Sequence, residues 1–130
     1  MLDSMSFFAL ASKRLDWLAA RQKVISENVA NANTPDFLAK EVAGFDSVLA
    51  GTQSGMTTTN ARHIATGSGG HGGPQVMTDA AAWERSIDGN TVVLEQQTVK
   101  AAEVSESYRL AAQLYRKGHD LLTLSVTGQR

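Results

Sequence analysis

Three histidines are the residues of this chain best suited to hold a metal. They are His63, His71 and His119. Zinc sites usually combine closely paired ligands with cysteines or carboxylates that complete the coordination shell. His63 and His71 lie eight positions apart among glycines, and His119 has only Asp120 beside it. We therefore expect solvated or interface histidines here and no metal site.

The other chemical candidates also have structural explanations. Residues 67–72 match the Gly-x-Gly-x-x-Gly pattern of dinucleotide sites, but such sites need a strand before the glycines and a helix after them. Pro74 follows instead. Asp88 and Glu95 could pair for acid–base catalysis, although a turn and the first turn of a helix account for both. We expect no catalytic residue, no cofactor and no enzymatic activity.

Composition restricts the partners. The chain has 130 residues, a formal net charge of -1 and no cysteine. It has no strong field of one sign that would attract nucleic acid or an anionic membrane, and disulfides and thiol catalysis are excluded. Its N-terminal apolar residues precede the basic ones, which is the wrong order for a secretory signal. We expect no nucleic-acid partner, no membrane insertion and no cleaved signal peptide.

Two long amphipathic helices are predicted at the ends of the chain. The first covers about residues 2–32, is capped by Asp3 or Ser4 and ends within 31–33, because Pro35 cannot continue it. Its apolar stripe, with steps of three and four, comprises Phe8, Ala11, Leu15, Leu18, Gln22, Ile25, Val29 and Ala32. Gln22 either fixes the register of a helical seam or lies at the edge of the apolar face.

The second helix should start near Val93, after a turn at residues 88–90. Gly118 weakens this helix by about 1 kcal/mol relative to Ala, which favours a bend or fraying there. The apolar face comprises Ala101, Val104, Tyr108, Ala111, Leu114 or Tyr115, and Leu121 or Leu122.

The predicted fold is mainly α, with the two terminal helices packed as a coiled-coil-like pair around a flexible middle that contains little regular structure. Residues 51–79 hold seven of the eleven glycines and few charges, so they bury too little apolar surface to offset ordering entropy. Four segments follow: an N-terminal helix at 1–33, a post-helix segment at 34–50, a Gly-rich middle at 51–90 and a C-terminal helix at 91–130.

Neither helix can bury its stripe alone, so the two should face each other. The seam is predicted to join Leu15, Leu18, Ile25 and Val29 to Val104, Tyr108, Ala111 and Leu114. Apolar surface would still remain, and copies of the same chain are the obvious partners for it.

The end of the first helix resembles the Asn-(Ile/Val/Leu)-Ala-Asn-x-x-Thr-Pro-Gly-(Tyr/Phe) signature of flagellar rod and hook proteins. The matching residues are Asn28, Ala30, Asn31, Thr34, Pro35 and Phe37. Asp36 replaces the usual glycine, and because Asp tolerates turn geometry the turn is expected to survive. His63 and Ile64, and the run Asp88, Gly89 and Asn90, are similar to segments of the proximal-rod branch of that family.

This resemblance implies a structural subunit of the proximal rod of the flagellar basal body, which polymerises through its terminal helices, transmits torque and is required for motility. It implies as partners other copies of the chain, rod proteins of the FlgC type, the rod-to-membrane-ring adaptor of the FliE type and the flagellar export apparatus. The chain would then leave the cytoplasm without a cleaved signal peptide and reach the periplasmic side. The alternatives are another subunit of the rod and hook family and a cytoplasmic helical module that binds a partner protein.

Overall fold

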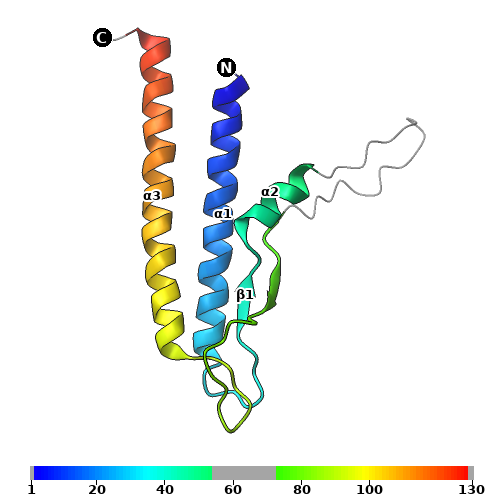
Figure 1. Cartoon of the computed structure of the whole chain (residues 1–130). Coiled ribbons are helices and arrows are strands. Elements are labelled where there is room, and N and C mark those ends of the chain that lie inside the picture. Colours follow the sequence, from blue (N-terminus) through cyan, green and yellow to red (C-terminus); the bar gives the residue numbers. More distant parts are fainter. Residues whose placement is uncertain (1, 54–72, 129–130) are drawn as a thin grey trace, which may run out of the picture.

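The computed structural model describes residues 2–53 and 73–128, with side chains placed at 6–50 and 73–128. The elements within these residues are α1 (Leu2–Ala30), β1 (Lys40–Val42), α2 (Phe45–Gln53), β2 (Val76–Thr78) and α3 (Leu94–Thr127). The prediction of a mainly α fold with packed terminal helices is confirmed (Figure 1). His63, Ile64 and His71 lie outside the described residues, as does the part of the predicted flexible middle from 54 to 72. The rest of residues 51–79 includes the end of α2 and all of β2.

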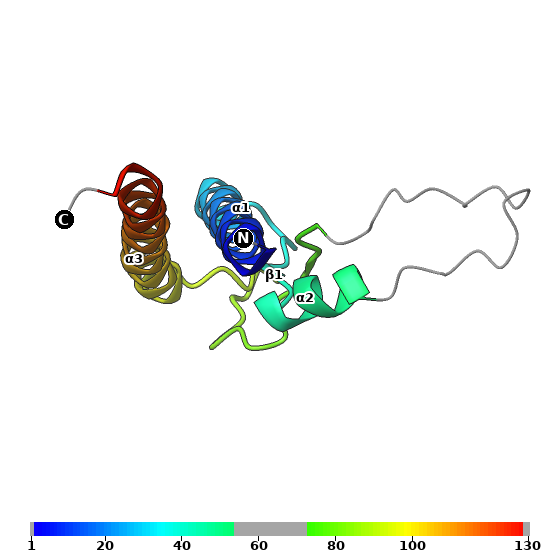
Figure 2. The same ribbon diagram turned by 90° about the horizontal axis from the view of Figure 1, so that it is seen from above.

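α1 is the middle layer of the molecule. α3 lies on one side of it, and the two strands with α2 lie on the other (Figures 1 and 2). α1 therefore buries two faces. Leu18 and Ile25 belong to the predicted stripe, whereas Trp17 and Val24 lie off that stripe and are also buried. The single predicted stripe was incomplete because the sequence periodicity of α1 did not reveal the second covered face.

The ends of the helices differ from the prediction by small amounts. α1 begins at Leu2, so the predicted cap at Asp3 or Ser4 is wrong, since both residues lie inside the helix. α1 ends at Ala30, just before the predicted range of 31–33. α3 begins at Leu94 after an extended Val93, which agrees with the predicted start. It also runs through Gly118 without interruption to Thr127, so the predicted fraying at Gly118 is wrong.

A short strand pair joins the middle of the chain to α1. β1 and β2 are antiparallel, and Lys40 pairs with Thr78 while Val42 pairs with Val76. One further backbone hydrogen bond flanks the pair at each end, 2.7 Å from Ala43 N to Gln75 O and 2.8 Å from Asp79 N to Ala39 O. Strands of three residues are too short to give a periodic signal, so the sequence did not predict them. The predicted segment boundary at residue 51 falls inside α2.

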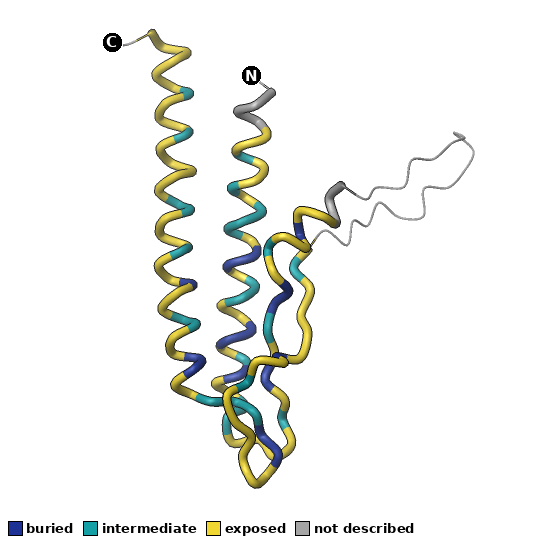
Figure 3. Tube along the Cα trace, viewed as in Figure 1, coloured by how far each residue is buried: buried dark blue, intermediate teal, exposed yellow. Residues whose placement is uncertain are grey.

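The hydrophobic core occupies only one half of the helical pair. Its buried members are Trp17, Leu18, Val24, Ile25, Val42, Val48 and Val104, with Ala20, Phe45, Ala101 and Ala111 partly buried against them. Figure 3 shows buried positions concentrated beside the strands, whereas the half nearer the chain termini is mostly exposed. We call the half beside the strands the strand end and the half nearer the chain termini the terminal end.

Candidate functional site

The residues that follow α1 form a compact turn, which we call the signature turn (residues 31–37). Asn31 accepts two hydrogen bonds from Thr34: one at 3.1 Å from the backbone N–H to the carbonyl oxygen, the other at 3.2 Å from the hydroxyl to the side-chain oxygen Oδ1. The Asn31 side chain also donates to the Glu27 carbonyl oxygen at 2.8 Å, which satisfies one of the acceptors left free where a helix ends. The signature residues therefore end α1 and turn the chain back toward the sheet.

Asp36 takes the left-handed conformation that the usual glycine of the signature would favour. Its φ is 59°, which Asp tolerates better than most residues. Its N–H donates to the Asp88 carbonyl oxygen at 2.9 Å. Gly89 lies against it with a φ of 84°, and a Cβ at Gly89 would collide with the Asp36 carboxylate. The turn is retained with Asp at position 36, as expected. The position that requires glycine is Gly89, which lies against Asp36.

Asn90 joins the signature turn to the start of α3. Its side-chain N–H groups donate to the carbonyl oxygens of Asn31 at 2.9 Å and Thr34 at 2.8 Å. Its Oδ1 accepts the Val92 N–H at 2.7 Å. Asn90 is buried, and a buried amide costs stability unless it is hydrogen-bonded. The similarity at residues 88–90 thus corresponds to a contact between the segment that follows α1 and the segment that precedes α3.

Asn28 acts as a substitute strand beside β1. Its Oδ1 accepts the Lys40 N–H at 2.9 Å, and its Nδ2 donates to the Lys40 carbonyl oxygen at 2.8 Å. This pair of bonds is what a neighbouring strand would make, so the amide closes the edge of β1 that β2 leaves open. The same Nδ2 donates to Gln97 Oε1 on α3 at 3.0 Å. One buried side chain therefore connects α1, β1 and α3.

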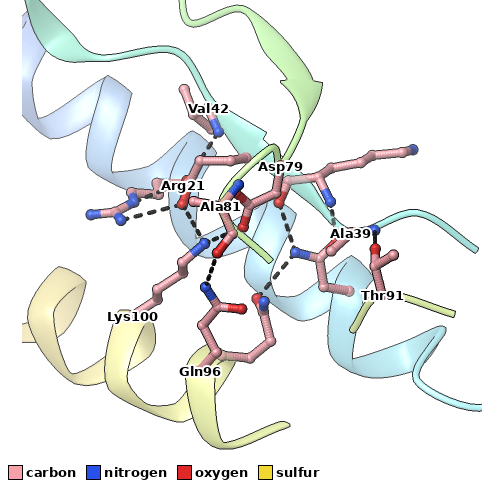
Figure 4. Close-up of polar contacts among 12 residues, drawn as sticks. Arg21, Ala39, Val42, Asp79, Ala81, Thr91, Gln96 and Lys100 are labelled. Atoms are coloured by element: carbon pink, nitrogen blue, oxygen red, sulfur yellow. Dashed lines mark hydrogen bonds and ion pairs between the residues drawn. The ribbon is translucent and has the colours of Figure 1, made fainter. Parts of the chain in front are cut away.

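A cluster of charges links the same elements (Figure 4). Lys100 on α3 forms ion pairs with Glu41 at 2.9 Å and with Asp79 at 2.5 Å. Arg21 on α1 pairs with the second Glu41 oxygen at 3.1 Å. Gln96 donates to the Ala81 carbonyl oxygen at 2.9 Å. This charge cluster joins β1 and the residue that follows β2 to both long helices.

The cluster shifts the pKa values of its members in opposite directions. Burial by itself would raise the pKa of Glu41, but hydrogen bonds from Arg21, Lys100 and the Val42 N–H together hold it below its usual value. Burial by itself would lower the pKa of Lys100, but hydrogen bonds to Asp79 and Glu41 raise it above its usual value. Both groups are therefore charged at neutral pH, and their pairing holds α3 to the sheet.

These contacts fasten helices and do not resemble a reaction centre. Among residues 2–53 and 73–128, no three His, Cys, Asp or Glu side chains are grouped so that they could hold a metal. The carboxylates of the cluster are paired with cations, and no nucleophile stands beside a base within the contacts described above. What the arrangement can do is hold two distant parts of the chain in one register.

The predicted seam residues divide between the interior and the surface. Leu18, Ile25 and Val104 are buried, Leu15 and Ala111 are half-buried, and Val29, Tyr108 and Leu114 are exposed. Gln22 is exposed at the edge of a groove beside Leu18 and Tyr108. Their role in assembly remains a prediction, because burial inside one chain does not report contacts between chains.

A leucine stripe covers the part of α3 nearer its end. It consists of Leu110, Leu114, Leu121 and Leu124, which are all exposed. Intervals of four, seven and three residues place them on one face of the helix. Tyr115 contacts α1 directly, because its ring packs edge-on against Phe8, with ring centroids 5.3 Å apart. The leucines therefore form an exposed apolar flank of α3 beside the face that packs against α1.

An apolar groove, the terminal groove, lies between α1 and α3 at the terminal end. It has a volume of about 490 Å³ and is lined by Phe7, Phe8, Leu114, Lys117, Gly118, Leu121 and Leu122. A Cβ at Gly118 would press into the Phe7 ring. Gly118 is therefore needed for the close approach of the two helices, which explains its place inside α3 despite its low helix propensity.

Sequence reasoning missed the contacts that hold the strand end together. Trp17, Gln97 and Lys100 carry them, and their partners lie far away in the chain. For Asn28 the family signature was an available signal, because it marks the residue even though it does not reveal the partner. No comparable signal pointed to the other three residues.

Polar contacts hold the two long helices together at the strand end, and apolar side chains stay exposed along them. These features define a helical subunit that is suited to assembly. No helix within the described ranges has both the length and the hydropathy that spanning a membrane requires.

Residues 10–37 match the family model of flagella basal body rod proteins. The chain is 32% identical to the flagellar basal body rod protein FlgB of Agrobacterium fabrum, with 96% of each chain covered. It is 28% identical to the FlgB protein of Cereibacter sphaeroides, with 84% of each covered. The FlgB protein of Escherichia coli is 27% identical, over 85% of this chain and 86% of the relative.

The chain therefore belongs to the FlgB family of flagellar basal body rod proteins. It is a structural subunit of the rod and associates with other rod components.

Proposed function

We propose that the chain polymerises through its terminal helices as a subunit of the proximal rod, where it transmits torque and is required for motility. The observation that carries this proposal is the leucine stripe on α3, which stays exposed beside the face that packs against α1. In a rod subunit such a face is available to the helices of neighbouring chains. The role is structural and involves no catalysis.

The partners follow from the same reasoning. Other copies of the chain, a rod protein of the FlgC type and the adaptor of the FliE type would contact these helices. The flagellar export apparatus would carry the chain out of the cytoplasm without a cleaved signal peptide. The leucine stripe supports helical neighbours in particular, because a stripe of this spacing fits the apolar face of another helix.

Ile25 and Val29 allow folding and assembly to be tested separately. Both were predicted to form the seam, but Ile25 is 3% exposed and Val29 is 47% exposed. A charge at Ile25 would be buried without a partner and should unfold the chain. A charge at Val29 can stay hydrated, so any loss of function would come from contacts with neighbours.

The experiment deletes the gene in the source bacterium and restores it with the wild type, Val29→Asp or Val29→Ala. Swimming is scored, and isolated basal bodies are viewed by electron microscopy. We expect the deletion to leave rings without a rod and the wild type to restore the rod. Val29→Asp should produce a folded, exported chain that does not restore it, while Val29→Ala should restore it in part or in full.

Complete rods and normal swimming in the deletion strain, with no second copy of the gene, would contradict the structural requirement. Normal rods with Val29→Asp would show that this part of α1 does not meet a neighbour, and would leave the leucine stripe as the contact to be examined.

A further inference from the structure

The turn that precedes α3, which we call the junction turn (residues 86–90), contains an Asp-Gly pair at Asp88 and Gly89. The sequence contains no other Asp followed by Gly. In such a pair the backbone nitrogen of the glycine can attack the side-chain carboxyl carbon of the aspartate, because glycine has no Cβ to obstruct the approach. Asp88 is exposed, whereas Gly89 is buried. The junction turn therefore holds both groups that a rearrangement of the backbone requires.

This rearrangement needs no enzyme and no co-reactant other than water. The Gly89 nitrogen forms a bond to Cγ of Asp88, and the hydroxyl of the carboxyl group leaves with the amide proton as water. The product is a five-membered succinimide ring, which water then opens. Attack on the carbonyl from the side chain restores Asp88, and attack on the carbonyl from the backbone leaves the chain linked through the side chain, as isoaspartate.

The fold accounts for both residues of the pair. Gly89 has a φ of 84°, and a Cβ there would collide with the Asp36 carboxylate, so a larger residue would be strained. Asp88 accepts the Asp36 N–H on its carbonyl oxygen at 2.9 Å. Its Oδ1 accepts the Asn90 N–H at 3.2 Å, which is the bond of an Asx turn. The reactive pair is therefore a consequence of the turn that joins residue 36 to the start of α3.

The hydrogen bonds of the closed turn oppose the reaction. The Gly89 N–H donates to the Ser86 carbonyl oxygen at 2.9 Å, so the nitrogen that would attack is already engaged. Oδ1 of Asp88 is held on the N–H of Asn90, one residue beyond that nitrogen. The Ser86 N–H closes the turn by donating to the Asn90 carbonyl oxygen at 2.8 Å. The carboxyl group and the Gly89 nitrogen therefore meet only after the turn has opened.

Asn90 limits how often the junction turn opens. Its side-chain amide donates to the carbonyl oxygens of Asn31 at 2.9 Å and Thr34 at 2.8 Å, and the residue is buried. An opening that carries Asn90 with it breaks both bonds, so its free-energy cost includes theirs. The open fraction of a segment falls as the free energy of its local opening rises. The open turn is therefore a minor state of the folded chain.

We propose that Asp88 is a site of spontaneous isoaspartate formation, and that opening of the junction turn sets the rate of this modification. The inference is independent of the proposed function, because it concerns a single chain. Isoaspartate adds one carbon atom to the backbone between residues 88 and 89, and so moves Asn90 out of register with its acceptors on the signature turn. A modified chain therefore loses the contact between the signature turn and the start of α3.

The rate is measured on the purified full-length chain, folded in buffer and unfolded in urea at the same pH and temperature. Trypsin then releases residues 86–100, since Arg85 precedes this segment and Lys100 ends it. Chromatography separates the isoaspartyl peptide from its isomer of equal mass. We expect isoaspartate to form at least about tenfold faster in urea, because the closed turn is held by several hydrogen bonds that each add a modest net stability.

A variant and its control test the role of opening. Asn90→Ala should raise the rate in the folded chain by about tenfold, because both bonds to the signature turn are lost. Asn33→Ala, at an exposed position of the signature turn, should leave the rate unchanged. Hydrogen exchange of the Gly89 amide needs the same opening, so Asn90→Ala should raise exchange and modification by the same factor.

If Asn90→Ala does not fold, the wild-type chain in urea below its unfolding midpoint replaces it, and the two rates should rise in parallel. Equal rates of modification in buffer and in urea would show that the fold does not control the reaction. No isoaspartate in urea would show that Asp88 is not a site of modification. Faster exchange at Gly89 without faster modification would show that opening of the junction turn does not set the rate. Each of these three results overturns the proposal.

Discussion

The strand end and the terminal end of the helical pair contain similar apolar patterns but bury them to different extents. At the strand end, α1 lies between α3 and the sheet, and Leu18 and Ile25 are almost fully buried. At the terminal end only two helices are present, and Leu110 and Leu121 are more than half exposed. An amphipathic stripe therefore determines which residues can be buried, and the number of packed layers determines which of them are.

Polar contacts are divided between the ends in the same way. Asn28, Asn90 and Lys100 tie α1, the sheet and α3 together at the strand end. At the terminal end the contacts between helices are mainly aromatic, such as that between Phe8 and Tyr115. Long helices in proteins depend on packing for their stability. The strand end therefore holds most of the contacts that stabilise the two helices within the chain, while the terminal end keeps apolar surface exposed.

The largest expected effect compares one leucine from each end. Leu18→Ala should lower the free energy of unfolding by about 2–5 kcal/mol, because it leaves a cavity in the core. Leu121→Ala should change it by less than about 0.5 kcal/mol, because Leu121 is exposed. Urea denaturation followed by circular dichroism measures both. Equal losses would show that the terminal end is as tightly packed as the strand end.

The next effect tests the polar contacts of the strand end. Asn28→Ala removes the amide that pairs with Lys40 and Gln97, and it should cost about 1–3 kcal/mol for each buried partner left unsatisfied. Asn33→Ala is the matched control, since Asn33 is exposed. It should stay within about 0.5 kcal/mol of the wild type. If the two variants unfolded at the same urea concentration, the role of Asn28 as a substitute strand would be refuted.

At the terminal end, Gly118 and Phe7 should be coupled. Alanine normally stabilises a helix by about 1 kcal/mol relative to glycine, and Gly118→Ala should show this gain only in a Phe7→Ala background. With Phe7 present, the new Cβ presses into its ring, so the gain should be lost. A double-mutant cycle of unfolding free energies measures the coupling. Additive effects would mean that the two helices do not approach closely at Gly118.

The smallest effect concerns the pH dependence of the charge cluster. The folded-state pKa of Glu41 lies below its usual value of 4.5. Its contribution to stability is therefore present above pH 4.5 and is lost as the pH falls through the folded-state pKa. Glu41→Gln should cost less than about 1 kcal/mol at neutral pH, and it should flatten the loss of stability below pH 4.5. Unfolding measured between pH 7 and pH 3 would show it, and parallel curves for the two chains would contradict it.

Lys100 should give the opposite dependence of stability on pH, in the alkaline range. Its folded-state pKa lies above 10.5, so its contribution is present below pH 10.5 and is lost as the pH rises through the folded-state pKa. Lys100→Met should therefore reduce the steepness of alkaline unfolding while it keeps most of the apolar contact of the side chain.

Local features of the chain were predictable from the sequence because neighbouring residues determine them. The periodicity of residues 2–32 and of the C-terminal segment predicted α1 and α3, and Pro35 predicted where the first helix must stop. The survival of the turn at Asp36 followed from the tolerance of Asp for turn geometry, whereas its left-handed conformation came from the structure. The run at residues 88–90 likewise predicted the turn before α3. Each of these depends on backbone sterics and on side chains within one or two turns.

The tertiary structure decided the features that join distant residues. Asn28 is separated from Gln97 by 69 positions, and no local pattern specifies such a pair. Trp17 and Val24 became core residues because the sheet covers a second face of α1, while Leu114 became a surface residue because Tyr115 and Ala111 lie closer to α1. The sequence by itself determined two amphipathic helices and the turns that end them. Only packing decided which apolar residues the chain covers and which remain exposed, since burial depends on the layers that meet at each position.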